Sequence, residues 1–91
     1  MHVISIKPFH EAAKKYPNRR LAIMDAYRVL RKANFKSPDE MRKVFPSLGN
    51  FKYEDKWWIV DIGGNKLRLI AFIQFMHNRM YVKHIFSHGS N

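Results

Sequence analysis

Three residues that suit chemistry on phosphate groups, Arg68, Lys83 and His88, fall on two strands that we expect to pair. A hairpin centred on residues 77–79 pairs positions whose numbers sum to about 156, which sets Arg68 opposite His88, give or take one or two residues. Arginine binds phosphate through paired hydrogen bonds, and lysine adds a point charge. Histidine exchanges protons near neutral pH. The sequence therefore predicts that an arginine and a histidine meet at one edge of a sheet.

Such a set suits RNA cleavage by attack of a ribose 2′-hydroxyl on the adjacent phosphate. The reaction needs a base, cations for the crowded phosphorane, and an acid for the leaving oxygen. It requires no metal, and the few carboxylates, Asp55 and Asp61 among them, are scattered; we expect neither a metal site nor a cofactor. A plainer reading stays open for each residue: Arg68 as the ion-pair partner of Asp61, and His88 as a surface histidine.

The charge balance also indicates a polyanionic partner. Seventeen Lys and Arg stand against 7 Asp and Glu, a formal net charge of +10. A nucleic acid, an acidic membrane surface and an acidic protein all fit this excess, and we favour nucleic acid because no basic amphipathic membrane anchor is evident. Lys52, Tyr53 and Lys56 form a basic and aromatic mixture. Tyr53, Trp57 and Trp58 suit stacking on bases, although aromatic residues at the start of a strand usually belong to the core.

Length and composition predict one small cytoplasmic domain spanning residues 1–91. The chain has no cysteine, which excludes disulfides and thiolate metal sites and favours a reducing compartment. No apolar run approaches the roughly 18–20 residues of a membrane span, and no signal-peptide hydrophobic region is present. We therefore expect no contact with a membrane.

The elements that must position these residues are helices first and strands afterwards. A short strand is expected over residues 2–6, helices over 9–16, 19–34 and 38–44, a loop over 47–50, and strands over 57–62, 66–76 and 80–88. Asn18 is predicted to cap the second helix, and Ser37 with Glu40 forms a capping box for the third. Gly63 and Gly64 make a turn rather than a phosphate loop, because no helix follows them. This order predicts an α+β fold, with N-terminal helices packed on one face of a small antiparallel meander.

Alternation along the strands predicts which residues share a face. On the last strand it groups Tyr81, Lys83 and Ile85, and it places His84 and His88 on the opposite side. The strand over 66–76 is apolar on both faces in its middle, which is typical of a central strand covered on both sides.

Several motifs taken together resemble the HigB toxins, members of the RelE-like superfamily of type II toxin–antitoxin systems. They are residues 45–48 (FPSL), 50–53 (NFKY), 55–56 (DK) and 62–68 (IGGNKLR). The resemblance covers almost the whole chain. The combination is specific, whereas none of its pieces would be alone.

The resemblance implies a RelE-like fold and a metal-independent endoribonuclease, an mRNA interferase that cleaves translated messages on the ribosome and arrests growth. It also implies neutralisation by a HigA-type helix-turn-helix antitoxin. The pair would repress its own operon, so that operator DNA is reached only through the antitoxin.

The resemblance also assigns site residues. Its catalytic set falls on Arg68, His88, Lys83 and Tyr53, and we expect RNA binding by Lys52, Lys56, Lys66 and Arg79. His88 matches the histidine of the family's terminal THxEY segment. After it this chain reads Gly89-Ser90-Asn91, where relatives continue with an acidic residue and a tyrosine, so attenuated nuclease activity is a further expectation.

Two other classes of function remain open. A non-catalytic RNA- or ribosome-binding module would bind RNA with steep salt dependence and leave it intact. An interaction protein would use its basic surface only to meet an acidic partner. A short helix-turn-helix gene beside this one would favour the toxin.

Overall fold

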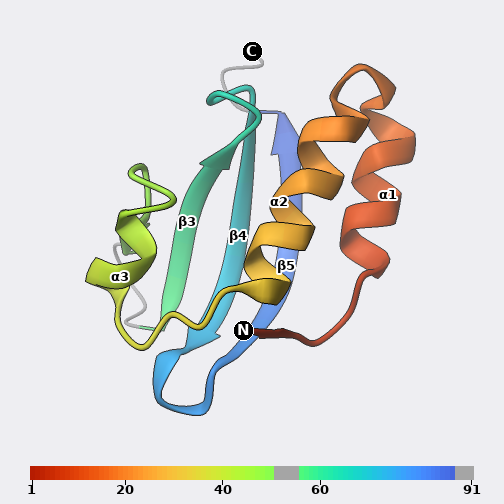
Figure 1. The fold of residues 1–91 in the computed structure, drawn as a ribbon. Coiled ribbons are helices and arrows are strands. Elements are labelled where there is room, and N and C mark those ends of the chain that lie inside the picture. The colour runs from red at the N-terminus through yellow and green to blue at the C-terminus, as the bar shows by residue number, and fades with distance from the viewer. Residues whose placement is uncertain (51–55, 88–91) are drawn as a thin grey trace.

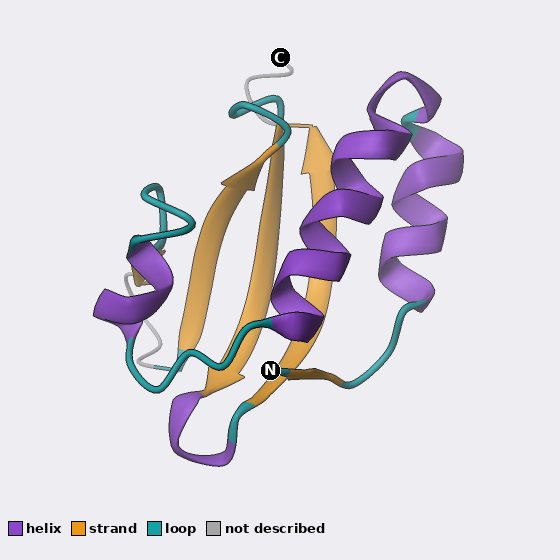
Figure 2. Cartoon of the chain, viewed as in Figure 1, coloured by secondary structure: helices purple, strands orange, loops and turns teal. Residues whose placement is uncertain are grey.

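The computed structural model describes residues 1–50 and 56–87. Its elements are β1 (His2–Val3), α1 (Lys7–Lys15), the 3₁₀ turn η1 (Pro17–Arg19), α2 (Arg20–Lys32), α3 (Pro38–Arg42), β2 (Gly49–Asn50), β3 (Trp57–Ile62), β4 (Leu67–Gln74), the 3₁₀ turn η2 (Phe75–His77) and β5 (Arg79–Ser87). The strands form a sheet, and α1 and α2 lie in front of it on one face (Figure 1, Figure 2). This arrangement confirms the predicted α+β fold with N-terminal helices on one sheet face.

The sheet has the strand order β1-β5-β4-β3-β2. Strands β3, β4 and β5 are antiparallel neighbours, as the meander predicts. The first strand was predicted without a partner; in the structure β1 runs parallel to β5 and pairs His2 with Arg79. Residues Gly49 and Asn50, predicted as loop, pair antiparallel with β3 and form the edge strand β2. The result is a mixed sheet whose long strands follow the predicted order.

The core lies between the helices and one face of the sheet. It includes the alternate β4 residues Leu67, Leu69, Ala71 and Ile73, and Ile23, Ala26 and Leu30 of α2. The intervening β4 residues are half-buried. The prediction that both faces of this strand are covered was therefore wrong, since the helices within the described residues cover one face only.

The start of α2 differs from the prediction. Asn18 does not cap this helix, because Pro17–Arg19 form a 3₁₀ turn that leads directly into it. Arg19 is the N-cap residue and makes no side-chain capping bond. Proline fixes φ near the helical value, so a turn beginning at Pro17 continues into α2 without an Asn cap.

None of the helices in residues 1–50 and 56–87 has the length and apolar character needed to cross a membrane.

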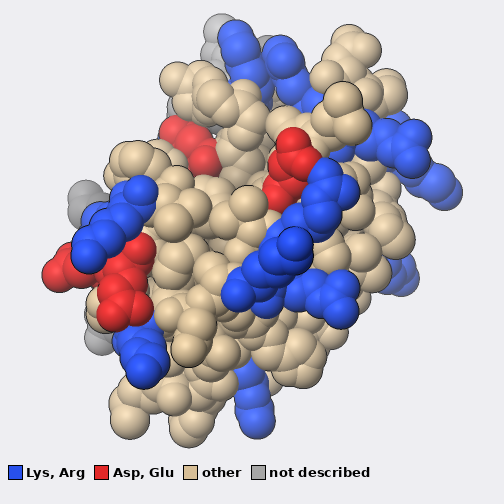
Figure 3. All heavy atoms as spheres, viewed as in Figure 1, with Lys and Arg blue, Asp and Glu red and all other residues tan. Residues whose placement is uncertain are grey.

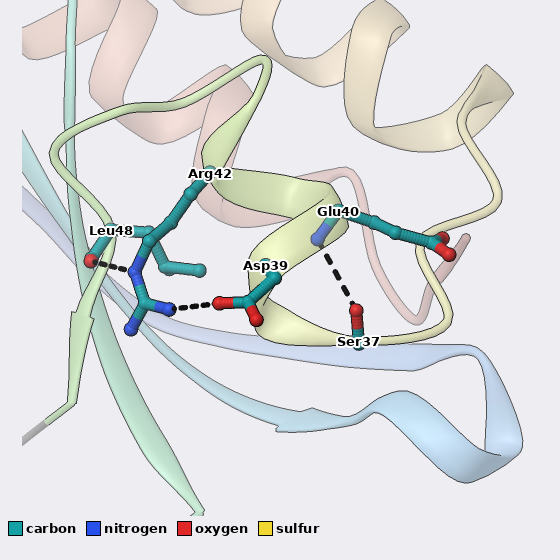
Figure 4. Close-up of polar contacts among 5 residues, drawn as sticks. All are labelled: Ser37, Asp39, Glu40, Arg42 and Leu48. Carbon is teal, nitrogen blue, oxygen red and sulfur yellow. Dashed lines mark hydrogen bonds and ion pairs between the residues drawn. The ribbon is translucent and has the colours of Figure 1, made fainter.

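The cap of α3 matches the prediction, although the helix ends at Arg42 rather than near residue 44. Ser37 Oγ accepts a hydrogen bond from the Glu40 amide at 3.2 Å. Arg42 donates to the Leu48 carbonyl oxygen at 3.1 Å and pairs with Asp39 at 3.0 Å (Figure 4). The bond from Arg42 to Leu48 fastens α3 to the loop that leads into β2.

The turn between β3 and β4 uses three residues at positive φ, Gly63, Gly64 and Asn65. Glycine adopts this conformation without steric cost, as predicted for this turn. It brings Asp61 of β3 opposite Arg68 of β4.

Candidate functional site

One face of the sheet carries no helix in the described part of the chain, and its side chains are half-buried or exposed. Cross-strand partners project to the same side of a sheet. The register gives three rows on this side: Asp61, Arg68 and Phe86; Ile59, Ile70 and His84; and Trp57, Phe72 and Tyr81. We call these nine residues, together with Lys83, the open face.

A β-bulge in β5 adds Lys83 to the open face. Ile70 and Ala71 are consecutive on β4, but their partners are His84 and Val82, so Lys83 is an extra residue between the two pairs. Lys83 and His84 are both exposed. The prediction that alternation places them on opposite faces was wrong, because a bulge interrupts the two-residue period.

Aromatic rings support two of the polar side chains of the open face. The Nζ atom of Lys83 lies 5.4 Å from the ring centroid of Trp57, so this lysine reaches across β4 to β3. The His84 ring stacks on Phe86 at 5.4 Å between centroids, with 27° between the planes. A lysine and a histidine are thereby held over the same face of the sheet.

Arg68 lies near the turn end of β4, where its partner on β5 is Phe86 rather than His88. The register thus differs by two residues from the predicted one. Arg68 Nε lies 3.5 Å from Asp61 Oδ1, and the two side chains are 34% and 21% exposed. The ion pair that the sequence left open is therefore present. The Arg68 side chain is still partly exposed on the open face, although its Nε atom is buried.

The remaining predicted cations are divided between the two sides of the sheet. Arg79 pairs with Gln74 at the end of the sheet farthest from Arg68 and is exposed. Lys66 is exposed and directly precedes β4, at the Arg68 end. Lys56 lies opposite Ile73 and lines a hollow with Trp58 on the helix side, so the structure does not bring it to the open face.

Three predicted residues, Tyr53, Lys52 and His88, lie outside the described residues. Conversely, sequence reasoning passed over His84, which the structure places beside Arg68's row. A signal was available: two adjacent polar residues, Lys83 and His84, interrupt the alternation of an otherwise amphipathic strand.

Lysine and arginine also gather on the helix side (Figure 3). Exposed examples on α1 and α2 are Lys14, Lys15, Arg20, Arg28, Arg31 and Lys32. Positive charge therefore does not select a face by itself. The open face differs in combining cations with a histidine and aromatic rings.

A hollow of about 660 Å³ lies on the helix side, between α2, the loop after α3 and the turn before β4. Val29 and Val44 line it and are 40% and 49% exposed. Its charged lining residues are two carboxylates, Asp25 and Asp61, of which Asp61 also belongs to the open face, and no Lys or Arg lines it. Carboxylates repel phosphate, so this hollow suits RNA less well than the open face does.

The donor set of the open face suits anions and proton transfer. Among the described residues, no group of three or more His, Asp or Glu is arranged to hold a metal ion. Arg68 and Lys83 offer N–H donors for phosphate oxygens, and His84 offers an imidazole that can give or take a proton.

Comparison with known proteins gives the family of the chain. The sequence pattern of HigB_toxin, a RelE-like toxic component of a toxin–antitoxin system, matches residues 19–90. The chain is 53% identical over 89 residues to the mRNA interferase HigB of Escherichia coli O6:H1, covering 98% of this chain and 86% of that protein. It is 38% identical over 88 residues to the mRNA interferase toxin HigB of Escherichia coli K12, covering 97% and 85%. The chain therefore belongs to the HigB family of RelE-like toxins, the toxic components of toxin–antitoxin systems.

Proposed function

We propose that this chain is the toxin of a type II toxin–antitoxin pair and an endoribonuclease that cleaves translated mRNA at the open face. Relatives over nearly its whole length are named mRNA interferases. The observation that carries the proposal is that Arg68, Lys83 and His84 lie on one sheet face that no described helix covers. These are the groups that phosphate binding and proton transfer require.

In the proposed reaction the ribose 2′-oxygen attacks the adjacent phosphorus while a base removes its proton. The bond from phosphorus to the 5′-oxygen breaks, and that oxygen takes up a proton from an acid. The products are a 2′,3′-cyclic phosphate and a 5′-hydroxyl, so the step balances without a metal ion. Arg68 and Lys83 stabilise the charge on the phosphorane. His84 and His88 are the candidates for proton transfer.

The ribosome is the proposed setting for this reaction. The cations of α1 and α2 lie on the helix side, away from an mRNA strand bound to the open face. A second basic surface suits a larger polyanion such as ribosomal RNA. This proposal also places the protein in the cytoplasm, where translated messages are found.

In this proposal, the antitoxin that the family implies is a HigA-type helix-turn-helix protein. A chain with a net charge of +10 has a surface that complements an acidic partner. Operator DNA would be reached through the antitoxin, which carries the DNA-binding motif.

The test is induction of this chain in bacteria, with the 5′ ends of a translated message mapped beside those of an untranslatable copy. We expect cuts in the translated copy only, and their loss in Arg68→Ala. Cuts in both copies would contradict ribosome dependence. Metal independence is tested with the purified chain on purified ribosomes, with EDTA added at a magnesium level that keeps the ribosomes intact. Cleavage that stops in EDTA would contradict metal independence.

A non-catalytic RNA-binding module is the second candidate. The Arg68–Asp61 ion pair favours it, because an arginine that already has a carboxylate partner is typical of a structural role. That function predicts intact message in induced cells and recovery of RNA with the purified chain. If extending the C-terminus with the tail of a relative then restored cleavage, the nuclease assignment would stand.

A further inference from the structure

A row of three aromatic rings crosses the open face. Trp57 on β3, Phe72 on β4 and Tyr81 on β5 are cross-strand partners. The ring centroids of Trp57 and Phe72 lie 5.6 Å apart, and those of Phe72 and Tyr81 lie 6.0 Å apart, both edge to face. We call these three residues the aromatic row.

The aromatic row lies outside the core. Tyr81 is 39% exposed, and Trp57 and Phe72 are half-buried. No α-helix of the described residues packs on this side of the sheet. Leaving apolar ring surface in water is unfavourable, so a row of this kind is typical of a surface that receives a partner.

Lys83 indicates the chemistry of that partner. Its ammonium group lies 5.4 Å from the centroid of the Trp57 ring, at a position where a planar ligand would stack. The lysine side chain is long and flexible, so it can leave the ring for a nearby phosphate when a base takes its place. An indole with a movable ammonium group beside it suits a ligand that carries both a planar ring and a negative charge.

Arginines lie on both sides of the aromatic row. Arg68 is four residues before Phe72 on β4, about 13 Å along the strand. Arg79 is two residues before Tyr81 on β5 and pairs with Gln74 at the next position of the same face. A single nucleic acid strand likewise presents phosphates along its length with bases between them.

We propose that the aromatic row stacks unpaired nucleobases of a single-stranded RNA, while Lys83, Arg68 and Arg79 meet its phosphates. The inference rests on the proposed function, which assigns RNA to this face, and it names unpaired RNA as the form that is bound. A duplex hides the faces of its bases in its own stack and would not fit the row. The stacked bases would belong to nucleotides next to the one whose phosphate Arg68 holds.

The two tryptophans of the chain allow a direct test, because Trp57 lies on the open face and Trp58 on the helix side. Trp58→Phe keeps only the tryptophan of the row, and Trp57→Phe is its matched control. The probe is a short oligothymidylate, which lacks the 2′-hydroxyl and is not cleaved. We expect it to quench the fluorescence of Trp58→Phe and to leave that of Trp57→Phe unchanged.

Binding affinity gives a second readout. It uses a substitution at Tyr81, which lies outside the core. Tyr81→Ala should weaken oligothymidylate binding by about 5- to 150-fold, the range for one lost stacked base. It should not weaken binding of an abasic oligonucleotide of equal length, which keeps the phosphates. Leu21→Ala, at a position of α2 that is 79% exposed, is the control and should leave both affinities unchanged.

Equal affinity for the normal and abasic strands, or equal quenching of both tryptophan variants, would overturn the inference. Neither assay involves cleavage, so the inference and the proposed function fail separately. If the chain cuts message but binds the normal and the abasic oligonucleotide equally well, the nuclease function holds and the aromatic row does not stack bases. If the chain stacks bases but never cuts message, the role of the aromatic row holds and the nuclease function does not.

Discussion

Trp57 and Trp58 are neighbours in the sequence and lie on opposite faces of the sheet in different surroundings. Trp58 lies on the helix side, with the Arg42 guanidinium 5.8 Å from its ring centroid and the Phe75 ring at 5.6 Å. Trp57 lies on the open face, with the Lys83 ammonium 5.4 Å from its ring centroid and the Phe72 ring at 5.6 Å. Side chains alternate along a strand. One face of β3, β4 and β5 therefore packs in the core, and the other presents the polar and aromatic side chains of the open face.

The same division runs along β4, where Leu69 lies in the core and Arg68 on the open face. It predicts that substitutions on the covered face change the free energy of unfolding. Substitutions on the open face should change RNA binding and cleavage while the protein stays folded.

The largest expected effect is loss of stability in Leu69→Ala. Leu69 is 1% exposed, and truncating a buried leucine costs about 2–5 kcal/mol of unfolding free energy. Denaturant unfolding followed by circular dichroism measures this loss. Cleavage per folded molecule should stay unchanged, and a folded Leu69→Ala protein without activity would contradict the division between the faces.

Arg68→Ala should lower the rate of message cleavage by about 10²–10³, because one donor to the developing phosphorane charge is lost. Its unfolding free energy should change by only about 0–1 kcal/mol, as for a partly exposed ion pair. Single-turnover cleavage of ribosome-bound message measures the rate. Arg42→Ala is the matched control, since Arg42 also pairs with an aspartate, Asp39, but lies on α3, away from the open face and from the cations of α1 and α2. Equal rates in both variants would remove Arg68 from the site.

A smaller effect is expected from the cap of α3. Ser37→Ala removes the acceptor for the Glu40 amide and should cost about 0.5–2 kcal/mol of unfolding free energy. Cleavage should be unaffected, because α3 lies on the helix side of β3. Thermal unfolding and a cleavage assay on the same sample test both statements, and reduced cleavage at full stability would show that α3 contributes to the site.

The smallest effect is expected from Asp61→Asn, which removes the charge of the carboxylate beside Arg68. The unfolding free energy should change by about 0–1 kcal/mol. Affinity for oligothymidylate should rise slightly, because a negative charge leaves the face that meets phosphate. Titrations at several salt concentrations measure this change. Weaker binding would instead mean that Asp61 orients Arg68 for its ligand.

The fold was largely predictable because local signals agreed with it. The bounds of β3, the cap at Ser37 and the glycine turn before β4 all follow from residue types at fixed spacing. The parallel pairing of β1 with β5 joins residues far apart in the sequence, and periodicity does not report such pairing. The two-residue strand β2 is too short to show any period.

The candidate site was predictable only in part, because it depends on register. The neighbour relation between Asp61 and Arg68 follows from the short turn that joins their strands. The face of Lys83 does not, because a single bulge in β5 changes which side a residue takes. His84 was passed over although alternation already placed it on the same face as His88, the expected partner of Arg68. The roles of Tyr53, Lys52 and His88 stay predictions, since these residues lie outside those that the structure describes.

The most direct test of the open face as the RNA-binding surface is methyl NMR of isoleucine and valine during titration with oligothymidylate. Ile59 and Ile70 lie on the open face, whereas Ile62 and Ile73 lie in the core. If RNA binds the open face, the signals of Ile59 and Ile70 should shift and those of Ile62 and Ile73 should stay unchanged. Unchanged signals from Ile59 and Ile70, with shifts at the valines of the helix-side hollow, would place the RNA on the other face.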